Sequence, residues 1–125
     1  MTRSVALLPA AASAAIALFL AGPANASEMR CGWLQNPTPG NYWLTDRDAS
    51  WTLLTQGGAE EPAGIEHLPD LSAGDYVRTN GNYGYACACM RVDTDAAENR
   101  ILAIHSVEQI AIARCRNDAS LLTPE

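Results

Sequence analysis

Residues 80–92 read Asn-Gly-Asn-Tyr-Gly-Tyr-Ala-Cys-Ala-Cys-Met-Arg-Val, and this stretch decides the fold. Asn-Gly is the strongest short signal for a hairpin, and β-prone residues flank it, so paired strands are expected over 76–79 and 83–92. Along the second strand, tyrosine, cysteine and arginine alternate with glycine, alanine, methionine and valine. Neither face is polar throughout, so we expect both faces of this strand to be covered.

A second predicted hairpin precedes this stretch, and one predicted strand follows it. Residues 42–45 and 51–56 are β-prone and are separated by the polar segment Asp46–Ser50, which predicts a hairpin with a longer loop. Residues 101–105 are apolar on both faces, as in a central strand. The segment 59–74 is rich in Glu, Pro, Gly and Ala without a clear period, so a surface loop with at most one short helical turn is expected there.

One short helix is predicted near the end of the chain. Ser106-Val107-Glu108-Gln109 has the pattern of a capping box, and apolar residues at helical spacing follow it, so the helix is placed over 107–114. The expected fold class is therefore mainly β: a small antiparallel sheet or partly open barrel of about five strands, with this C-terminal helix and two disulfides.

The four cysteines, Cys31, Cys87, Cys89 and Cys115, predict those two disulfides, as an even count does in an exported chain. Cys87 and Cys89 stand two residues apart in a strand, so their Cα atoms lie about 6.6–6.8 Å apart, whereas a disulfide prefers about 5.5–6 Å. Each is therefore expected to bond one outer cysteine, and the sequence leaves open which one. The alternative is a thiol-disulfide active site built from the inner pair.

Residues 1–26 have the pattern of a cleavable signal peptide. Met1-Thr2-Arg3 supplies a basic start, Val5–Ala21 is almost wholly apolar, and Ala24-Asn25-Ala26 offers the small residues that place the cut before Ser27. The apolar run is shorter than the roughly 20 residues of a membrane span. Residues 27–125 are therefore expected to form a single disulfide-stapled β-rich domain, periplasmic or secreted, with no membrane anchor.

The charge balance of the expected mature chain disfavours two classes of partner. It holds seven arginines, no lysine and fourteen acidic residues, for a net charge of about −7. Nucleic acids and anionic membrane surfaces both require a basic face on the protein. We therefore expect no nucleic-acid partner.

The candidate binding residues surround a proline-rich segment. Residues 36–41 read Asn-Pro-Thr-Pro-Gly-Asn, in which the prolines fix the backbone, so a stiff loop rather than a strand is expected. A rigid loop loses little entropy on binding, and aromatic side chains often anchor partners. Trp51 is expected in the core, and for Trp33 and Trp43 both burial and exposure stay open. The candidate site consists of Trp33, Asn36, Asn41, Tyr42 and Trp43.

No catalytic residue, cofactor or metal site is predicted. The Asp46/Asp48 and Asp93/Asp95 pairs alternate as in a calcium loop, but the remaining ligands of that motif do not follow, so they are interpreted as turn formers. His67 falls in a loop and His105 in a strand, where it is expected to be a core residue. No nucleophile motif accompanies either histidine.

Several motifs, in one order, resemble a family of small exported bacterial proteins catalogued as a domain of unknown function. The resemblance covers nearly all of residues 31–118 and implies a periplasmic or secreted single domain, without any activity to carry over. The motifs are Cys31-Gly32-Trp33-Leu34, Asn36–Asn41, Trp51 with Gln56-Gly57-Gly58, Asn80–Tyr85 with Cys87 and Cys89, and Cys115-Arg116-Asn117-Asp118.

Two functions from different classes follow from these residues. The first is a non-enzymatic periplasmic binding or inhibitory protein, which presents the candidate site to a protein or glycan of the cell envelope. The second is an exported thiol-disulfide redox enzyme that uses Cys87 and Cys89. The strand geometry, which disfavours a bond between Cys87 and Cys89, favours the first.

Overall fold

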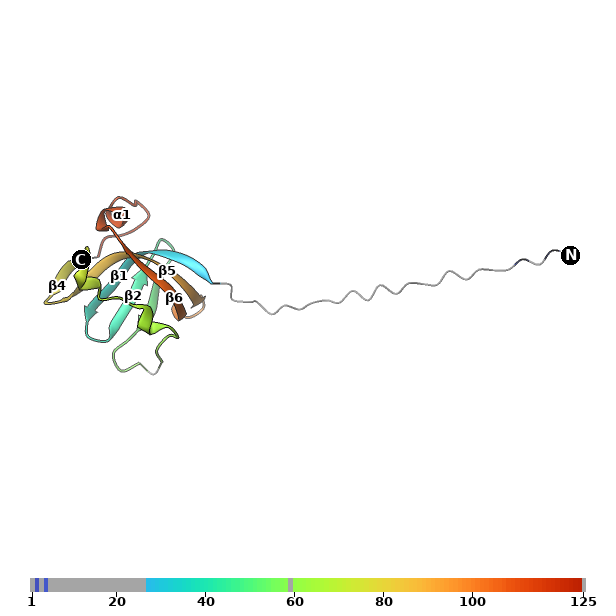
Figure 1. The fold of residues 1–125 in the computed structure, drawn as a ribbon, viewed down its shortest axis with the longest axis horizontal. Helices are drawn as coiled ribbons and strands as arrows, with labels where there is room; N and C mark the ends of the chain where they lie inside the picture. Colours follow the sequence, from blue (N-terminus) through green and yellow to red (C-terminus); the bar gives the residue numbers. More distant parts are fainter. Residues whose placement is uncertain (1, 3, 5–26, 59, 125) are drawn as a thin grey trace.

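The computed structural model describes residues 2, 4, 27–58 and 60–124 (Figure 1). Apart from Thr2 and Ser4, the expected signal peptide lies outside the described residues, and so does its predicted cleavage site. The elements, in chain order, are β1 (Glu28–Thr38), β2 (Asn41–Thr45), β3 (Ser50–Leu54), η1 (Ile65–His67), η2 (Leu71–Ala73), β4 (Val77–Asn80), β5 (Tyr83–Asp95), β6 (Arg100–Ile110) and α1 (Ile112–Arg116).

All the strands belong to one sheet that curls into a ring, with the order β1-β2-β3-β6-β5-β4 and an added pairing of β1 with β5. The neighbours pair antiparallel, except that β3 and β6 run parallel and meet only at Thr52 and Arg100. The ring is thus loosely closed at this one seam and is not a regular barrel. β4 adds to β5 beside the end of β6. The expected mainly β, partly open barrel with a short C-terminal helix is confirmed.

β1 corrects the expectation of a loop before Tyr42. Residues 28–36 pair antiparallel with residues 84–92 of β5, and the strand continues to Thr38. Pro37 fits because the β1–β2 register is irregular between Gln35 and Thr38, and a strand tolerates proline at such an irregularity. Only Pro39 and Gly40 form the turn into β2.

The predicted helix over 107–114 is wrong in its first half. β6 continues to Ile110, and residues 106–110 pair with residues 87–91 of β5. Gln109 does not cap a helix, because its side-chain amide donates to the backbone oxygens of Leu71 and Asp75. The inter-strand hydrogen bonds and these contacts outweigh the local capping signal. The helix itself is α1, which has only five residues.

Both predicted hairpins are confirmed. β2 and β3 pair across the loop that contains Asp46, and β4 and β5 pair across Gly81 and Asn82. Between them, the segment 59–74 holds two short 3-10 turns, η1 and η2, where at most one helical turn was expected.

The two sides of the ring bury separate clusters. Inside it, Trp51 joins the core, as expected, with Leu34, Leu44, Leu53 and Met90. Outside it, α1 covers a smaller cluster on β1 and β5, in which the Trp33 ring meets Tyr85 edge to face at 5.2 Å. Alternation along β1 explains the division, because Leu34 points inward and Trp33 outward.

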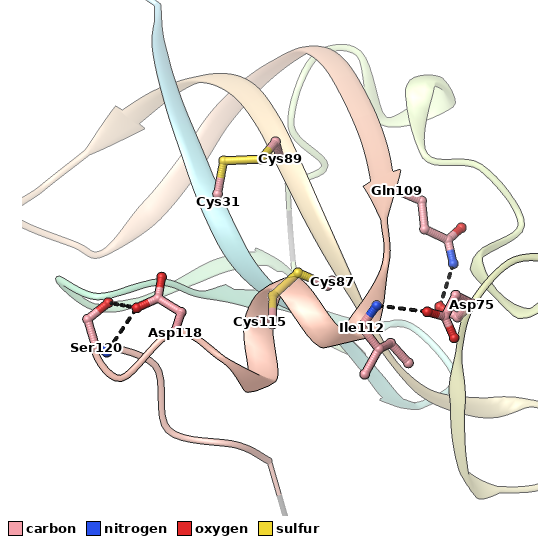
Figure 2. The surroundings of a disulfide bond; sticks show 9 residues. All are labelled: Cys31, Asp75, Cys87, Cys89, Gln109, Ile112, Cys115, Asp118 and Ser120. Atoms are coloured by element: carbon pink, nitrogen blue, oxygen red, sulfur yellow. Dashed lines mark hydrogen bonds between the residues drawn. A yellow bond between two sulfur atoms is a disulfide. The ribbon is translucent and has the colours of Figure 1, made fainter.

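The outer cysteines each bond an inner one, as predicted (Figure 2). Cys31 and Cys89 are register partners on β1 and β5, so their disulfide crosses two neighbouring strands. Cys87 bonds Cys115 and thereby fastens α1 to the sheet. Figure 2 also shows Asp75 accepting a hydrogen bond from the Ile112 amide at 2.8 Å, which fixes the start of α1.

Candidate functional site

The turn between β1 and β2 is braced by two asparagines of the candidate site. The Asn36 side-chain amide donates to the carbonyl oxygens of Thr38 and Asn41, at 2.9 and 2.8 Å. Asn41 donates to the Thr38 hydroxyl at 2.6 Å and accepts from the Gln56 amide at 2.8 Å. Asn36 is buried, so these bonds are shielded from water. The turn is therefore held in one conformation, with Pro39 and Gly40 exposed at its tip.

Tyr42 and Trp43 follow this turn on opposite faces of β2. Tyr42 packs partly buried against the inner core. Burial, together with the neighbouring Tyr83 and Asp70, raises the pKa of its phenol. Trp43 is half-buried on the outer face, because Leu44 beside it points into the ring. The structure thus gathers Asn41, Tyr42 and Trp43 at one end of the sheet.

Trp33, one of the five residues of the candidate site, does not lie on the surface of the protein. Its side chain is fully buried in the cluster beneath α1. Its indole nitrogen has no hydrogen-bond partner among the described residues. Trp33 and Asn36 can therefore support a binding surface from within, whereas Asn41, Tyr42 and Trp43 can contact a partner.

Sequence reasoning missed a charged cluster around Arg30. Its guanidinium donates to Asp46 at 2.7 Å, to Glu28 at 3.0 Å and to Asp48 at 3.3 Å. It also lies 4.0 Å from the centre of the Trp51 ring, a cation–π contact. The Arg30 side chain is 14% exposed and that of Asp46 is 5% exposed. No local pattern could reveal this cluster, because pairing of β1 with β2 brings its residues together.

Asp46 is a turn former, as interpreted, and it also accepts a hydrogen bond from the Trp51 side chain in the core. One carboxylate oxygen, Oδ1, accepts from the amides of Asp48 and Ala49, both at 2.9 Å, and from Trp51 Nε1 at 3.1 Å. Burial alone would raise the pKa of this carboxyl, but the hydrogen bonds from Arg30, the two amides and Trp51 outweigh it and lower the pKa below 3.8. Asp95 likewise accepts from the amides of Ala97 and Glu98, at the turn between β5 and β6.

The two histidines and the four cysteines each have partners within the fold. The expectation that His105 is a core residue is wrong, because its side chain lies exposed on β6, 3.0 Å from an Asp93 oxygen. His67 contacts the Ile104 carbonyl oxygen at 3.0 Å. All four cysteines are spent in disulfides, and Cys87 does not bond Cys89.

Within residues 27–58 and 60–124, no three His, Cys, Asp or Glu side chains gather as a metal site would require. In the same part of the chain, no helix has the length and apolar character to cross a bilayer.

One cavity lies beside the Arg30 cluster. It has a volume of about 370 Å³, and its wall includes Glu28, Arg30, Asp46, Asp48 and Asp118. A second cavity, of about 240 Å³, lies along the β3–β6 seam and is lined by residues that include Thr52, Leu54 and Arg100. Both walls are largely polar.

Residues 25–122 match the model of a family described as a protein of unknown function, DUF4087. No curated protein and no solved structure matches the chain.

Proposed function

We propose that this chain, which belongs to the DUF4087 family of proteins of unknown function, is an exported, non-enzymatic binding or inhibitory protein. Its partner is a protein or glycan outside the cytoplasm. The observation that carries the proposal is the braced turn after β1, where two asparagine side chains hold an exposed tip beside Tyr42 and Trp43.

The bracing supports binding because it removes an entropic penalty before a partner arrives. Immobilising a flexible loop costs free energy on association, and a loop already fixed in the free protein avoids most of that cost. Gln56 ties the turn to the segment after β3 through Asn41. The tip is thus anchored from both sides without the tip residues themselves being buried.

The position of the turn in the ring adds support by analogy. Small, partly open five-stranded barrels bind oligosaccharides and oligonucleotides through the face of their second and third strands and the neighbouring loops. Here β2, β3 and the β1–β2 turn hold the equivalent places, and the acidic charge of the chain disfavours oligonucleotides. The oligosaccharide half of that analogy is compatible with this chain.

The bonding of the cysteines argues against the redox alternative. A thiol-disulfide enzyme needs two cysteines that exchange between a dithiol and a shared disulfide. Cys87 and Cys89 instead each hold a different part of the fold, α1 in one case and β1 in the other.

Two disulfides fit a compartment that is oxidising, such as the periplasm or the exterior of the cell. The expected cut before Ser27 provides the test of export. N-terminal sequencing of protein recovered from the periplasm or medium should begin at Ser27, and material that still carries residues 10–21 would contradict the proposal.

The binding role is tested by capture from an extract of the cell envelope. Immobilised protein that starts at Ser27 is compared with its Trp43→Ala and Asn36→Ala variants, and retained proteins and glycans are identified by mass spectrometry. The matched control is Leu102→Ala, because Leu102 is an exposed apolar residue on β6. We expect a ligand retained by the wild type and the control but reduced in both site variants. Equal retention by all four proteins would refute this site.

A further inference from the structure

Five side chains share the outer face of β1, β2 and β3 beside the braced turn. We call them the outer strip: Gln35, Trp43, Thr45, Ser50 and Thr52. Leu44, Trp51 and Leu53 point into the ring, so alternation turns their neighbours on β2 and β3 outward. Two hydrogen bonds confirm the common face, from Gln35 Nε2 to the Thr45 hydroxyl at 3.0 Å and between the Thr45 and Ser50 hydroxyls at 2.8 Å.

The strand register places the indole of Trp43 between polar side chains of the neighbouring strands. Gln35 is opposite Trp43, and Trp43 is opposite Thr52, so one row across the sheet reads amide, indole, hydroxyl. In the next row, Thr45 is opposite Ser50. Trp43 is half-buried, so part of its ring system is open to solvent. A flat apolar ring with hydrogen-bonding groups on both sides matches a pyranose, which has an apolar CH face and a rim of hydroxyls.

The outer strip carries no charge, although 22 of the 125 residues of this chain are Asp, Glu or Arg. Trp43 is the one apolar side chain of the strip, with Leu54 beside it on β3, whereas the core of a protein–protein interface is mostly apolar and has several anchors. The strip therefore favours a neutral, hydroxyl-rich ligand over a charged ligand or a protein surface.

The strip leads at Thr52 to the cavity of about 240 Å³ along the β3–β6 seam. Arg100 lines this cavity, and its Nη2 donates to the Glu60 carbonyl oxygen at 3.4 Å. A guanidinium has five N–H donors, so a ligand hydroxyl in the cavity can accept from another of its terminal N–H groups. Glu60 and Glu98 line the same cavity, so the carboxylate of an acidic sugar would be repelled there.

From these observations we infer that the outer strip and the adjoining cavity bind a neutral oligosaccharide, with Trp43 as the stacking platform and Thr52 and Arg100 as hydrogen-bonding groups. This inference rests on the proposed binding function and narrows its partner to one class. Three of the polar side chains of the strip, Gln35, Thr45 and Ser50, are already linked by hydrogen bonds, so little further ordering of them accompanies binding.

The test uses protein that starts at Ser27 and four probes: the neutral hexasaccharides of cellulose, chitin and starch, and an oligogalacturonate of equal length as the acidic counterpart. Tryptophan fluorescence reports contact with the platform, because Trp33 is 0% and Trp51 3% exposed, which leaves Trp43 as the indole open to a ligand. Calorimetry gives the affinity. We expect saturable binding of at least one neutral hexasaccharide and none of the oligogalacturonate.

Two site variants and one control complete the experiment. Trp43→Ala should weaken the affinity about tenfold through loss of the stacking surface. Thr52→Val, which keeps the shape of the side chain, should weaken it about threefold through loss of one hydrogen bond. Leu102→Ala on β6 should leave it unchanged. Circular dichroism and thermal unfolding verify that each variant is folded, and if Trp43→Ala is not, Trp43→Leu takes its place.

The outcomes separate the inference from the proposed function. Failure of all three neutral hexasaccharides to bind, or equal binding to a folded Trp43 variant, overturns the inference. Equal binding of the oligogalacturonate also overturns it. If a protein is then captured from envelope extract in a manner that depends on Trp43, the binding function stands with a protein partner. If nothing is captured, both proposals fail.

Discussion

Arg30 of β1 and Asp46 of the first hairpin loop are joined by a 2.7 Å hydrogen bond between Nη1 and Oδ2, in a setting that largely excludes water. Removing one partner of such a pair leaves the other buried and poorly compensated. We expect Asp46→Asn to lower the free energy of unfolding by about 2–3 kcal/mol, less than the usual maximum because Glu28 and Asp48 still face Arg30. Urea unfolding followed by fluorescence measures this.

The matched control is Asp48→Asn in the same loop. The Asp48 side chain is 58% exposed and its contact with Arg30 is longer, at 3.3 Å, so solvent screens the interaction. Its removal should cost below about 1 kcal/mol. Equal losses in the two variants would show that burial of the Arg30–Asp46 pair does not matter.

Acid should destabilise the domain partly through Asp46. The pKa of this carboxyl is lowered in the folded protein, so the unfolded state binds its proton more readily. The resulting stability is fully present above the ordinary pKa of about 4 and is lost as the pH falls through the lower folded value. Unfolding free energies of wild type and Asp46→Asn, measured between pH 7 and pH 2, should converge toward the acid end. A constant difference over this range would contradict the assignment.

The two disulfides should differ more in accessibility than in their contribution to stability. They separate their cysteines by 58 and 28 residues, which in the chain-entropy description gives about 4 and about 3.5 kcal/mol. Cys31 is exposed, whereas Cys87 and Cys115 are 1% and 2% exposed. A mild hydrophilic thiol should therefore open Cys31–Cys89 first, which alkylation and peptide mapping would show. Initial opening of Cys87–Cys115 would refute this order.

Gly32 should resist substitution because β2 approaches it closely. A Cβ at this buried position would lie 2.1 Å from the Thr45 carbonyl oxygen, so the backbone of β1 or β2 would have to move. Gly32→Ala should destabilise the domain by about 3 kcal/mol or more. In the control Gly81→Ala the new Cβ meets open space, and only the positive φ of 59° opposes it, at about 1 kcal/mol. Thermal unfolding compares the two.

Loss of the Asn36 amide should loosen the β1–β2 turn. Asn36→Ala deprives the Thr38 and Asn41 carbonyl oxygens of a buried donor, at a cost of about 2 kcal/mol. Asn36→Asp keeps the size but cannot donate, and it should lose at least as much at pH 7. Hydrogen exchange at the Gln56 amide, which donates to Asn41, should accelerate in both variants. If the exchange rate at Gln56 is unchanged, Asn36 does not contribute to the rigidity of the turn.

The features that the sequence predicted correctly are those with local or simple geometric causes. The Asn80-Gly81 turn, the β2–β3 hairpin and the bonding of outer to inner cysteines each follow from a short pattern or from the spacing of side chains in a strand. Trp51 in the core follows from its size and its place in a β-prone run.

The features that the sequence did not reveal depend on contacts between distant segments. Residues 106–110 have a helix-start pattern, but β5 provides a ladder of hydrogen bonds that holds them in β6. Pro37 near the end of β1 and Pro39 in the following turn indicate a loop, yet the first nine residues of β1 pair with β5. In the candidate site, the burial of Trp33 depends on α1, whose position the local pattern misplaced.

The pairing of β1 with β5 also governs the order in which the molecule can assemble. The paired residues of the two strands are 48 to 64 positions apart in the chain, from Asn36 with Gly84 to Glu28 with Val92, and contacts of such long range slow folding. The chain is synthesised from its N-terminus, so Cys31 has no native partner until Cys89 of β5 has been made. The first cysteine to reach it is Cys87, whereas its native partner is Cys89. A Cys31–Cys87 bond is therefore the expected early product of oxidation, and it must exchange to Cys31–Cys89 before Cys87 is free to bond Cys115.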